Sequence, residues 1–136
     1  PGVFAVGDVR DKILRQVATS VGDGATAGFM LERYIAETEF FNKEFRGVKG
    51  PQMVLCYDPT DSLCREKMTI IEEFGKNHPE IIYNKIDVYK GRSMAERLGV
   101  KPDPCLVIMH DGKIKEILPL NNLTVETVQK KISQVA

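Results

Sequence analysis

The sequence contains few cysteines and no excess of charge of either sign. Its 136 residues include three cysteines, at positions 56, 64 and 105. Such a low, odd number argues against the disulfide framework of a small secreted protein. Lysine plus arginine and aspartate plus glutamate both number 19, so the formal net charge is zero. Without a basic field, we expect no nucleic-acid partner and no anionic membrane partner.

Long hydrophobic runs, metal-ligand motifs and a secretory leader are also missing. No apolar run approaches the ~20 residues of a membrane-spanning helix. There is no C-x-x-C pair, and His78 and His110 lie in no ligand-spaced cluster, so we expect no metal site. We expect a cytoplasmic protein. The chain begins with Pro-Gly and not with methionine, so we also expect a piece of a longer protein.

The sequence that is present divides into two parts. Residues 46–52 read RGVKGPQ, and their two glycines and proline interrupt any helix. Before this point the apolar run GVFAVGD predicts a short strand, and apolar residues at helical spacing predict a long helix from Gly24 to about Phe45. The length suits one domain or one domain with a tail.

After residue 50 the predicted order is strand, helix, strand, helix, strand, strand, helix. The expected ranges are 52–57, 61–76, 81–88, 92–99, 105–110, 113–118 and 124–135. Strands joined through a helix can be parallel, whereas the last two strands, joined by Asp-Gly, form an antiparallel hairpin. The sequence therefore predicts an α/β fold with a mixed four-stranded sheet (β-α-β-α-β-β-α) flanked by helices, preceded by an N-terminal helical tail.

The first part carries a recognisable series of motifs. An apolar run ends in Gly-Asp, Arg-Gln-Val follows, and a glycine-rich stretch leads into a helix ending Glu-Arg-Tyr. Residues 1–36 thereby resemble the end of the FAD domain of low-molecular-weight thioredoxin reductases. The resemblance implies flavin contacts, made in the longer parent protein only, by Asp8, Arg15, Gln16, Val17, Gly24 and Ala25.

The resemblance also assigns each of these residues a place. Asp8 would lie at the ribityl and pyrophosphate groups, and residues 15–17 would run beside the isoalloxazine ring. The helix N-terminus, at Gly24 and Ala25, would point at the flavin. Residues 1–46 are thus predicted to be the truncated end of an FAD domain, either partly disordered or packed on the second module. FAD, NADPH and the remaining reductase domains are implied for the parent, and no cofactor for this chain alone.

The second part is predicted to be a thioredoxin-like domain over residues 47–136, because residues 50–136 resemble thioredoxin in their order of elements and in the motif KPDPCLVIMHDGK. Thioredoxins carry a proline, usually cis, before their third strand, and the resemblance maps it to Pro104. A cis bond would suit a loop that presents its backbone to the redox helix. Pro102 is the alternative for the turn position.

The same register places the family's redox residues. Cys64 falls on the second, buried cysteine of the family's dithiol, and Asp61 falls on the first, nucleophilic one. Thr60 replaces the usual tryptophan, Leu55 replaces the buried acid, and Tyr83 replaces the lysine partner of that acid. The resemblance therefore implies the thioredoxin-like fold without ordinary dithiol–disulfide exchange.

The residues themselves leave several roles open. Asp61 is suited to capping the helix by accepting a hydrogen bond from the amide of residue 63 or 64. Cys64 is expected in the core, although a helix N-terminus could activate its thiol and Asp61 would oppose that. Cys56 is expected to be a core residue. Cys105 could pair with Cys64 if their Cα atoms lie within about 7 Å.

Three function classes follow for this chain. The favoured one is a docking or regulatory module that binds through Tyr57, Pro59, Thr60 and Pro104 at the ends of the strands. The alternatives are a one-cysteine redox module using Cys64, alone or paired with Cys105, and a structural or dimerisation element. The parent is predicted to be an NADPH-dependent thioredoxin-disulfide reductase, and this chain to be inactive by itself. Its partner would be thioredoxin or another disulfide-containing protein.

Overall fold

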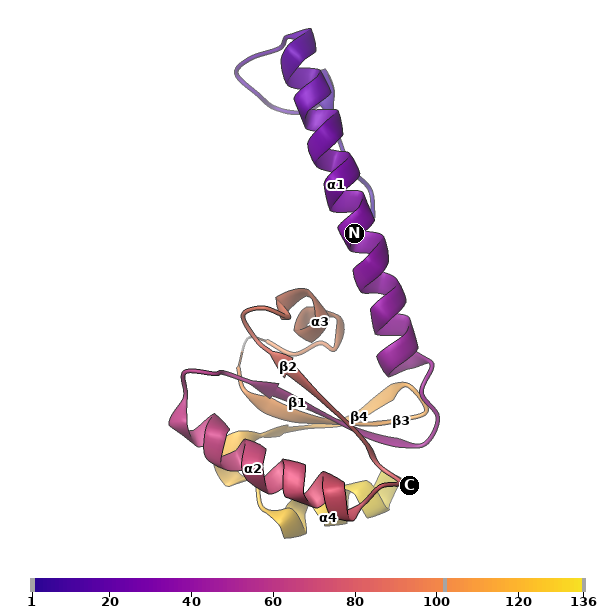
Figure 1. Cartoon of the computed structure of the whole chain (residues 1–136), viewed down its shortest axis with the longest axis vertical. Helices are drawn as coiled ribbons and strands as arrows, with labels where there is room; N and C mark the ends of the chain where they lie inside the picture. The colour runs from indigo at the N-terminus through magenta and orange to yellow at the C-terminus, as the bar shows by residue number, and fades with distance from the viewer. Residues whose placement is uncertain (1, 102, 136) are drawn as a thin grey trace. The chain divides into compact units, whose positions relative to one another are not determined.

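The computed structural model describes residues 2–101 and 103–135 and divides into two compact units (Figure 1). The first unit extends to Asn42 and the second begins at Lys43. A π-helical turn, η2 (Asn42–Arg46), contains this division. The boundary predicted after residue 46 is the end of that turn.

The N-terminal unit is one long helix with a loop beside its first turns. The helix, α1 (Val17–Phe41), begins at Val17 and not at Gly24 as predicted, because the backbone amide of Gln16 donates to the Thr19 hydroxyl at 3.2 Å and opens the helix there. The predicted strand GVFAVGD is absent. Its end forms a short 3-10 turn, η1 (Gly7–Val9), since none of the described residues offers this segment a strand to pair with.

The second unit contains the predicted mixed sheet, in the order β2-β1-β3-β4. Its strands are β1 (Pro51–Tyr57), β2 (Ile82–Asp87), β3 (Cys105–His110) and β4 (Lys113–Pro119). β1 pairs in parallel with β2, and the β1–β3 and β3–β4 pairs are antiparallel. The helices are α2 (Ser62–Asn77), α3 (Arg92–Arg97) and α4 (Val125–Val135), and a 3-10 turn, η3 (Leu120–Asn122), precedes α4. The predicted fold class is confirmed.

The two central strands, β1 and β3, are buried on both faces of the sheet. Alternate residues of the two strands, such as Leu55 and Leu106, pack into one cluster with side chains from α2 and α4. The residues between them, including Cys56 and Cys105, point to the opposite face because successive side chains alternate along a strand. Cys56 lies beside Ile86, whose side chain lies against the start of α3. Figure 1 shows α2 and α4 on one side of the sheet and α3 on the other.

The hairpin between β3 and β4 turns at Asp111 and Gly112, as predicted. Both residues have positive φ, at 50° and 70°, which is the backbone of a two-residue hairpin turn. A side chain on Gly112 would collide with the carbonyl group of Arg46. Asp111 accepts a hydrogen bond from the Gly50 amide at 2.9 Å, so this turn also anchors the entry into β1.

Candidate functional site

Asp61, which the resemblance to thioredoxin predicts at the position of the family's nucleophile, caps α2. Its backbone is extended (φ −84°, ψ 128°), and its side chain accepts a hydrogen bond from the Leu63 amide at 2.9 Å. This geometry satisfies one of the amides that a helix N-terminus leaves without a partner. The predicted capping role of Asp61 is confirmed.

Cys64 lies one turn into α2 with its thiol enclosed. The side chain is fully buried, and its Sγ accepts from the Asp58 amide and lies 3.5 Å from the Asp61 carboxylate, to which it donates. Burial raises the pKa of the Cys64 thiol, and the hydrogen bond to Asp61 raises it further. The core location predicted for Cys64 is therefore observed, and its surroundings favour the protonated thiol over the nucleophilic thiolate.

The position of the family's buried acid holds an apolar side chain. Leu55 is fully buried in the cluster that contains Cys64, so no carboxylate stands there to accept a proton from the thiol. Its neighbour on β2 in the sheet is Lys85, which reaches out to Glu72 at 3.0 Å. Tyr83, which maps to the lysine partner, lies opposite Met53 instead, and burial raises its pKa.

A hydrogen-bonded turn forms the rim of this site. Asp58 accepts hydrogen bonds from the amide and the hydroxyl of Thr60, at 2.7 and 2.6 Å, and from the hydroxyl of Tyr89 at 3.0 Å. The hydrogen bonds from Thr60 are the main reason that the pKa of Asp58 is lowered. Sequence reasoning missed both Asp58 and Tyr89. The Asp-Pro-Thr turn signal could have identified Asp58, but nothing local connects it to Tyr89 at the far end of β2.

The residues predicted to form a docking surface come from two loops of the second unit. Pro59 and Thr60 are exposed, whereas Tyr57 and Pro104 are half-buried. No peptide bond among the described residues is cis, so the bond before Pro104 is trans, contrary to the isomer that would suit the family. Pro102, the alternative turn residue, lies outside the described residues.

Cys105 lies opposite Cys56 and not beside Cys64. The antiparallel register of β1 and β3 pairs Cys56 directly with Cys105, on the sheet face opposite the Cys64 cluster. Strand alternation is the reason, because Leu55 and Leu106 take the Cys64 face and their chain neighbours take the other. The structure thus does not bring Cys64 and Cys105 together. All three thiols are free, and Cys56 is fully buried as predicted.

The two facing thiols differ in their acidity. The interaction between the two side chains raises the pKa of Cys56 and lowers the pKa of Cys105. Cys105 also lines a cavity of about 230 Å³, bounded by Gly99, Val100, Lys101, Asp103, Pro104, Ile117 and Pro119. The neighbouring pair of thiols was missed at the sequence level because only the strand register creates it.

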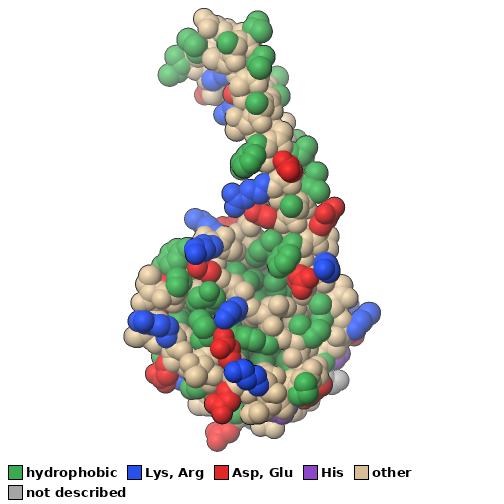
Figure 2. Space-filling model, viewed as in Figure 1, with side chains coloured by type: hydrophobic (Ala, Val, Ile, Leu, Met, Phe, Trp, Pro, Cys, Tyr) green, Lys and Arg blue, Asp and Glu red, His purple; other side chains and the backbone are tan. Residues whose placement is uncertain are grey.

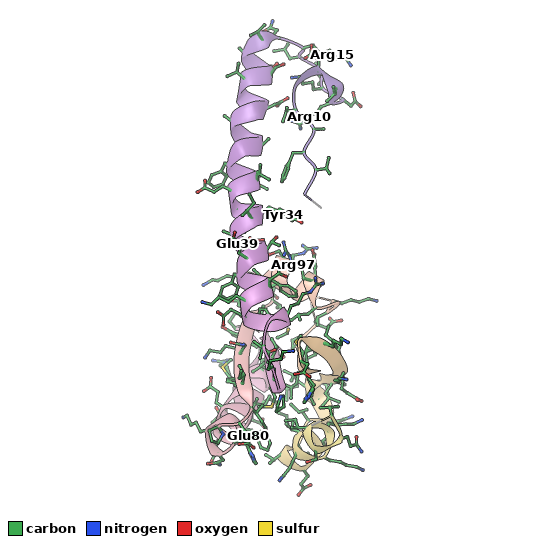
Figure 3. The ribbon with its side chains drawn as sticks, turned by 90° about the vertical axis from the view of Figure 1, so that its right-hand side faces the viewer. Arg10, Arg15, Tyr34, Glu39, Glu80 and Arg97 are labelled. Carbon is green, nitrogen blue, oxygen red and sulfur yellow. The ribbon has the colours of Figure 1, made fainter. Side chains whose placement is uncertain are left out.

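In the N-terminal unit, the residues predicted to face a flavin are mostly exposed. Asp8 accepts a 3.4 Å hydrogen bond from the Ser20 hydroxyl and lies 3.7 Å from the Lys12 ammonium. Residues 15–17 are exposed, with Arg15 in the loop before α1 (Figure 3). Gly24 and Ala25 lie inside α1 and not at its N-terminus, because the helix begins at Val17. Their predicted place at a helix end is therefore wrong.

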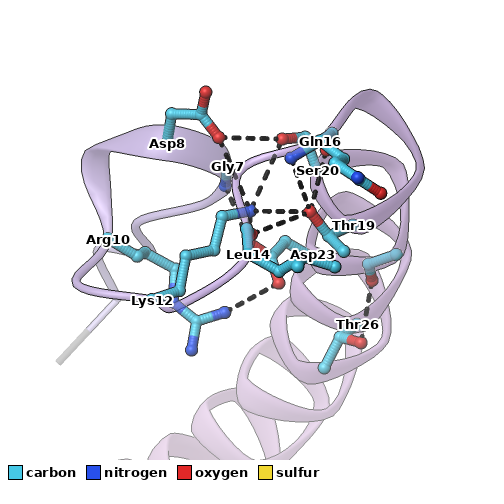
Figure 4. Close-up of polar contacts among 11 residues, drawn as sticks. Gly7, Asp8, Arg10, Lys12, Leu14, Gln16, Thr19, Ser20, Asp23 and Thr26 are labelled. Carbon is cyan, nitrogen blue, oxygen red and sulfur yellow. Dashed lines mark hydrogen bonds and ion pairs between the residues drawn. The ribbon is translucent and has the colours of Figure 1, made fainter.

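Asp23 organises this loop, and sequence reasoning missed it. Its carboxylate accepts hydrogen bonds from the Gly7 amide at 3.0 Å, Arg10 at 2.9 Å and Lys12 at 3.1 Å (Figure 4). The pKa of Asp23 is lowered, first by the hydrogen bond from Lys12. These polar contacts hold the η1 loop against the first turns of α1. The sequence does contain a weak signal for this role of Asp23. It is an acidic residue directly before the predicted start of the helix, and the loop that precedes the helix contains the basic residues Arg10 and Lys12.

The described part of the chain contains no group of three or more His, Cys, Asp or Glu side chains placed to hold a metal ion. None of its helices is both long enough and apolar enough to cross a membrane.

Comparisons with known proteins connect the chain to two groups of proteins. A stretch of 37 residues is 54% identical to a thioredoxin reductase of Listeria monocytogenes, covering 27% of this chain and 12% of that protein. A 38-residue stretch is 58% identical to a thioredoxin reductase of Penicillium chrysogenum, covering 28% of this chain and 11% of that enzyme. The chain thus spans only about an eighth of these relatives. No family model matches the chain.

The second group consists of solved thioredoxin structures, which are similar to this chain in fold. Thioredoxin of Fasciola hepatica superposes with a TM-score of 0.58 at 20% identity, covering 73% of this chain and 90% of that protein. Thioredoxin of Plasmodium falciparum gives a TM-score of 0.59 at 17% identity, covering 73% of this chain and 93% of its own. At such low identity the match shows the fold alone. The chain therefore has a thioredoxin-like fold together with a short segment similar to thioredoxin reductases.

Proposed function

We propose that this chain joins the end of a thioredoxin reductase-like flavin domain to a thioredoxin-like module that docks a disulfide-containing protein. The module would bind its partner without exchanging thiols at Asp61 and Cys64. One observation carries this proposal: the Cys64 sulfur is enclosed by the Asp58 amide and the Asp61 carboxylate. A carboxylate in the place of the attacking thiolate favours the neutral thiol and cannot form a disulfide.

The docking role rests on the features that remain around this disabled site. Thr60 and Tyr89 stiffen the Asp58 turn, and Pro59 and Thr60 are presented on its surface. A preorganised turn loses little conformational entropy when a partner binds. Binding loops at the ends of strands are the usual ligand face of open α/β sheets. The expected partner is thioredoxin or another protein that contains a disulfide.

The reductase activity itself belongs to the proposed longer protein. Its flavin would meet Asp8 and residues 15–17, whose exposure in this chain suits ligand contact. Gly24 and Ala25 fit that role poorly, because α1 already uses the backbone amides at its interior for its own hydrogen bonds. FAD and NADPH would supply the electrons for disulfide reduction, and the residues that bind most of both would come from the rest of that protein.

The test is a binding titration of the chain with an oxidised thioredoxin as the probe, followed by calorimetry. Thr60→Arg places a long charged side chain in the proposed contact, and we expect it to weaken binding at least about tenfold. Thr69→Arg makes the same change on an exposed position of α2 and should leave the affinity unaltered. Equal effects of the two variants, or no binding by the unmodified chain, would count against docking at this turn.

The same preparation should fail to catalyse reduction of insulin by dithiothreitol beyond the uncatalysed rate. The reason is that Asp61 cannot act as the attacking thiolate. Activity that disappears on Cys64→Ala would instead support the one-cysteine redox module. The two assays therefore separate docking from thiol exchange at this site.

A second candidate function, a structural or dimerisation element, is favoured by the surface of α1. Several large apolar side chains of this helix are exposed, with Phe29 at 66% and Phe40 at 53%. Figure 2 shows hydrophobic side chains along the surface of the helix. Exposed apolar surface of this kind is typical of a face that another protein surface covers. Light scattering after gel filtration would test it: a dimer that Phe29→Glu converts to a monomer supports this role, and a monomeric unmodified chain contradicts self-association.

A further inference from the structure

Cys56 and Cys105 are free thiols at directly opposed positions of two antiparallel strands. Directly opposed residues of antiparallel strands have Cα atoms about 4.5–5.5 Å apart. That spacing falls inside the range of about 4.4–6.8 Å over which disulfides join two Cα atoms. Cys56 and Cys105 are opposed in this way at the last pair of the β1–β3 ladder. Oxidation would therefore require no shift of register.

The two thiols are not equivalent in access. Cys56 is fully buried, whereas Cys105 keeps 5% of its surface exposed and lines the cavity of about 230 Å³. The cavity lies at or below the small end of ligand pockets, which run from roughly 300 to 1,000 Å³. It can admit one half of a low-molecular-weight disulfide, but it cannot admit a folded protein. An incoming disulfide therefore meets Cys105 first.

The interaction between the two thiols also favours Cys105 as the attacking thiol. The two side chains are opposed in the β1–β3 register, and their interaction raises the pKa of Cys56 and lowers the pKa of Cys105. A thiolate is the nucleophile in disulfide exchange, and a second thiol nearby is needed to resolve the mixed disulfide. The pair thus contains an attacking thiol at the wall of the cavity and a fully buried resolving thiol.

We propose that Cys105 and Cys56 form a redox-active dithiol that reduces a low-molecular-weight disulfide entering the cavity beside Pro104. The Cys105 thiolate attacks one sulfur of the small disulfide, which breaks its S–S bond and releases one half as a thiolate that takes up a proton. Cys56 then loses its proton and attacks the Cys105 sulfur. The Cys56–Cys105 bond forms, and the second half leaves as a thiol. The small disulfide gains two electrons, and the protein dithiol loses them.

This activity is separate from the docking role proposed above. It uses the sheet face opposite Cys64 and needs neither Asp61 nor the Asp58–Thr60 turn. Failure of the Thr60→Arg test would leave it standing, and failure of the test below would leave docking standing.

Glutathione disulfide is the probe for the test. The reduced chain is incubated with it, quenched with acid and an alkylating agent, and mapped by peptide mass spectrometry. We expect a Cys56–Cys105 linkage and two released glutathione molecules per chain, with the same result for the control Cys64→Ala. A Cys64–Cys105 linkage, or three thiols that stay reduced, would overturn the proposal.

Single-cysteine variants test the order of attack. Cys56→Ser removes the resolving thiol and should leave a stable mixed disulfide on Cys105. Cys105→Ser should leave Cys56 unmodified, because Cys56 is fully buried and does not line the cavity. Glutathione attached to Cys56 in that variant would contradict the assignment. Circular dichroism checks that both variants are folded.

Alkylation kinetics of the unmodified chain provide a measurement that needs no variant. We expect iodoacetamide to modify Cys105 at least about tenfold faster than Cys64, because Cys105 lines the cavity whereas Cys64 is fully enclosed. A common rate for all three thiols that rises in step with urea-induced unfolding would show that access comes only through global opening, and it would overturn the proposal.

Discussion

Two buried cysteines lie near the same end of β1 on opposite faces of the sheet, and their surroundings act on them in opposite directions. Cys64, in the first turn of α2, faces the Asp61 carboxylate, and its pKa is raised. Cys105, on the α3 side, faces the Cys56 thiol, and its pKa is lowered. Burial is common to both. The difference lies in the neighbouring group, since an acceptor carboxylate stabilises the thiol and a donor thiol stabilises the thiolate.

For both cysteines, the position in the family resemblance does not determine the chemistry of the thiol. The resemblance predicts Cys64 at the position of the family's second redox cysteine, and Asp61 and Leu55 at the positions of its attacking partner and of the buried acid. Cys105 follows the family's proline position, yet its register gives it a thiol partner on the neighbouring strand. The thioredoxin-like fold is therefore retained while the better-placed thiol pair lies on the other face.

The largest effect should come from restoring the acid on the Cys64 face. Leu55→Asp would place an unpaired carboxylate in the apolar cluster and destabilise the chain by about 3–5 kcal/mol at neutral pH. Burial would raise the pKa of the new group, so this loss should shrink as pH falls toward its unfolded value of about 3.9. Urea unfolding at several pH values measures both effects.

Leu55→Asn is the matched control, because asparagine has the same shape as aspartate and carries no charge. Its destabilisation should not change with pH over this interval. If Leu55→Asp is tolerated and speeds alkylation of Cys64, the two faces differ less than we conclude.

The next effect concerns the pH dependence of stability. The pKa of Cys64 is raised in the folded state, so its contribution is complete below the unfolded thiol pKa of about 8.5 and is lost as pH rises through the folded value. The unmodified chain should lose at most about 1.4 kcal/mol more than Cys64→Ala per pH unit in that window. Parallel urea titrations of the two proteins give the difference. Identical curves would show that Cys64 is not held as a thiol.

Removing the cap should have a smaller effect on stability and a clear effect on Cys64. Asp61→Ala should cost about 1 kcal/mol, since the Leu63 amide loses its acceptor. Asp61→Asn should retain most of that stability. Both variants should lower the pKa of Cys64, because both remove the carboxylate that favours the thiol. Thermal unfolding and the pH profile of Cys64 alkylation test the two effects separately, and an unchanged profile in both variants would contradict the role of Asp61.

The smallest effect should come from the rim. Tyr89→Phe removes one donor to Asp58, so the pKa of Asp58 should rise toward its ordinary value. Thr60→Val should raise it further, because the hydrogen bond from the Thr60 hydroxyl is the larger cause. Carboxyl titration followed by NMR measures both. The reverse order would show that Tyr89 dominates the turn, and neither variant should change alkylation at Cys105.

Much of the second unit was predictable from short stretches of sequence. The strand–helix order, the Asp-Gly hairpin and the Asp61 cap all depend on residues within a few positions of one another. The N-terminal strand was predicted wrongly because a strand needs a partner, and the described chain offers it none. The start of α1 was placed at Gly24 because glycines suggested a helix end, whereas Gln16 and Thr19 open the helix at Val17.

The sequence by itself determined which elements form, because hydrophobic period, capping and turn chemistry act locally along the chain. It also determined that Asp61 caps α2, because the cap and the amide that it binds are two residues apart. Only the tertiary structure decided which thiols meet. The register of β1 against β3 places Cys56 opposite Cys105, and strand alternation sends Cys64 and Cys105 to different faces. A one-residue change in register would move the side chains of a strand to the other face of the sheet. The residues next to a single cysteine in the sequence do not determine that register.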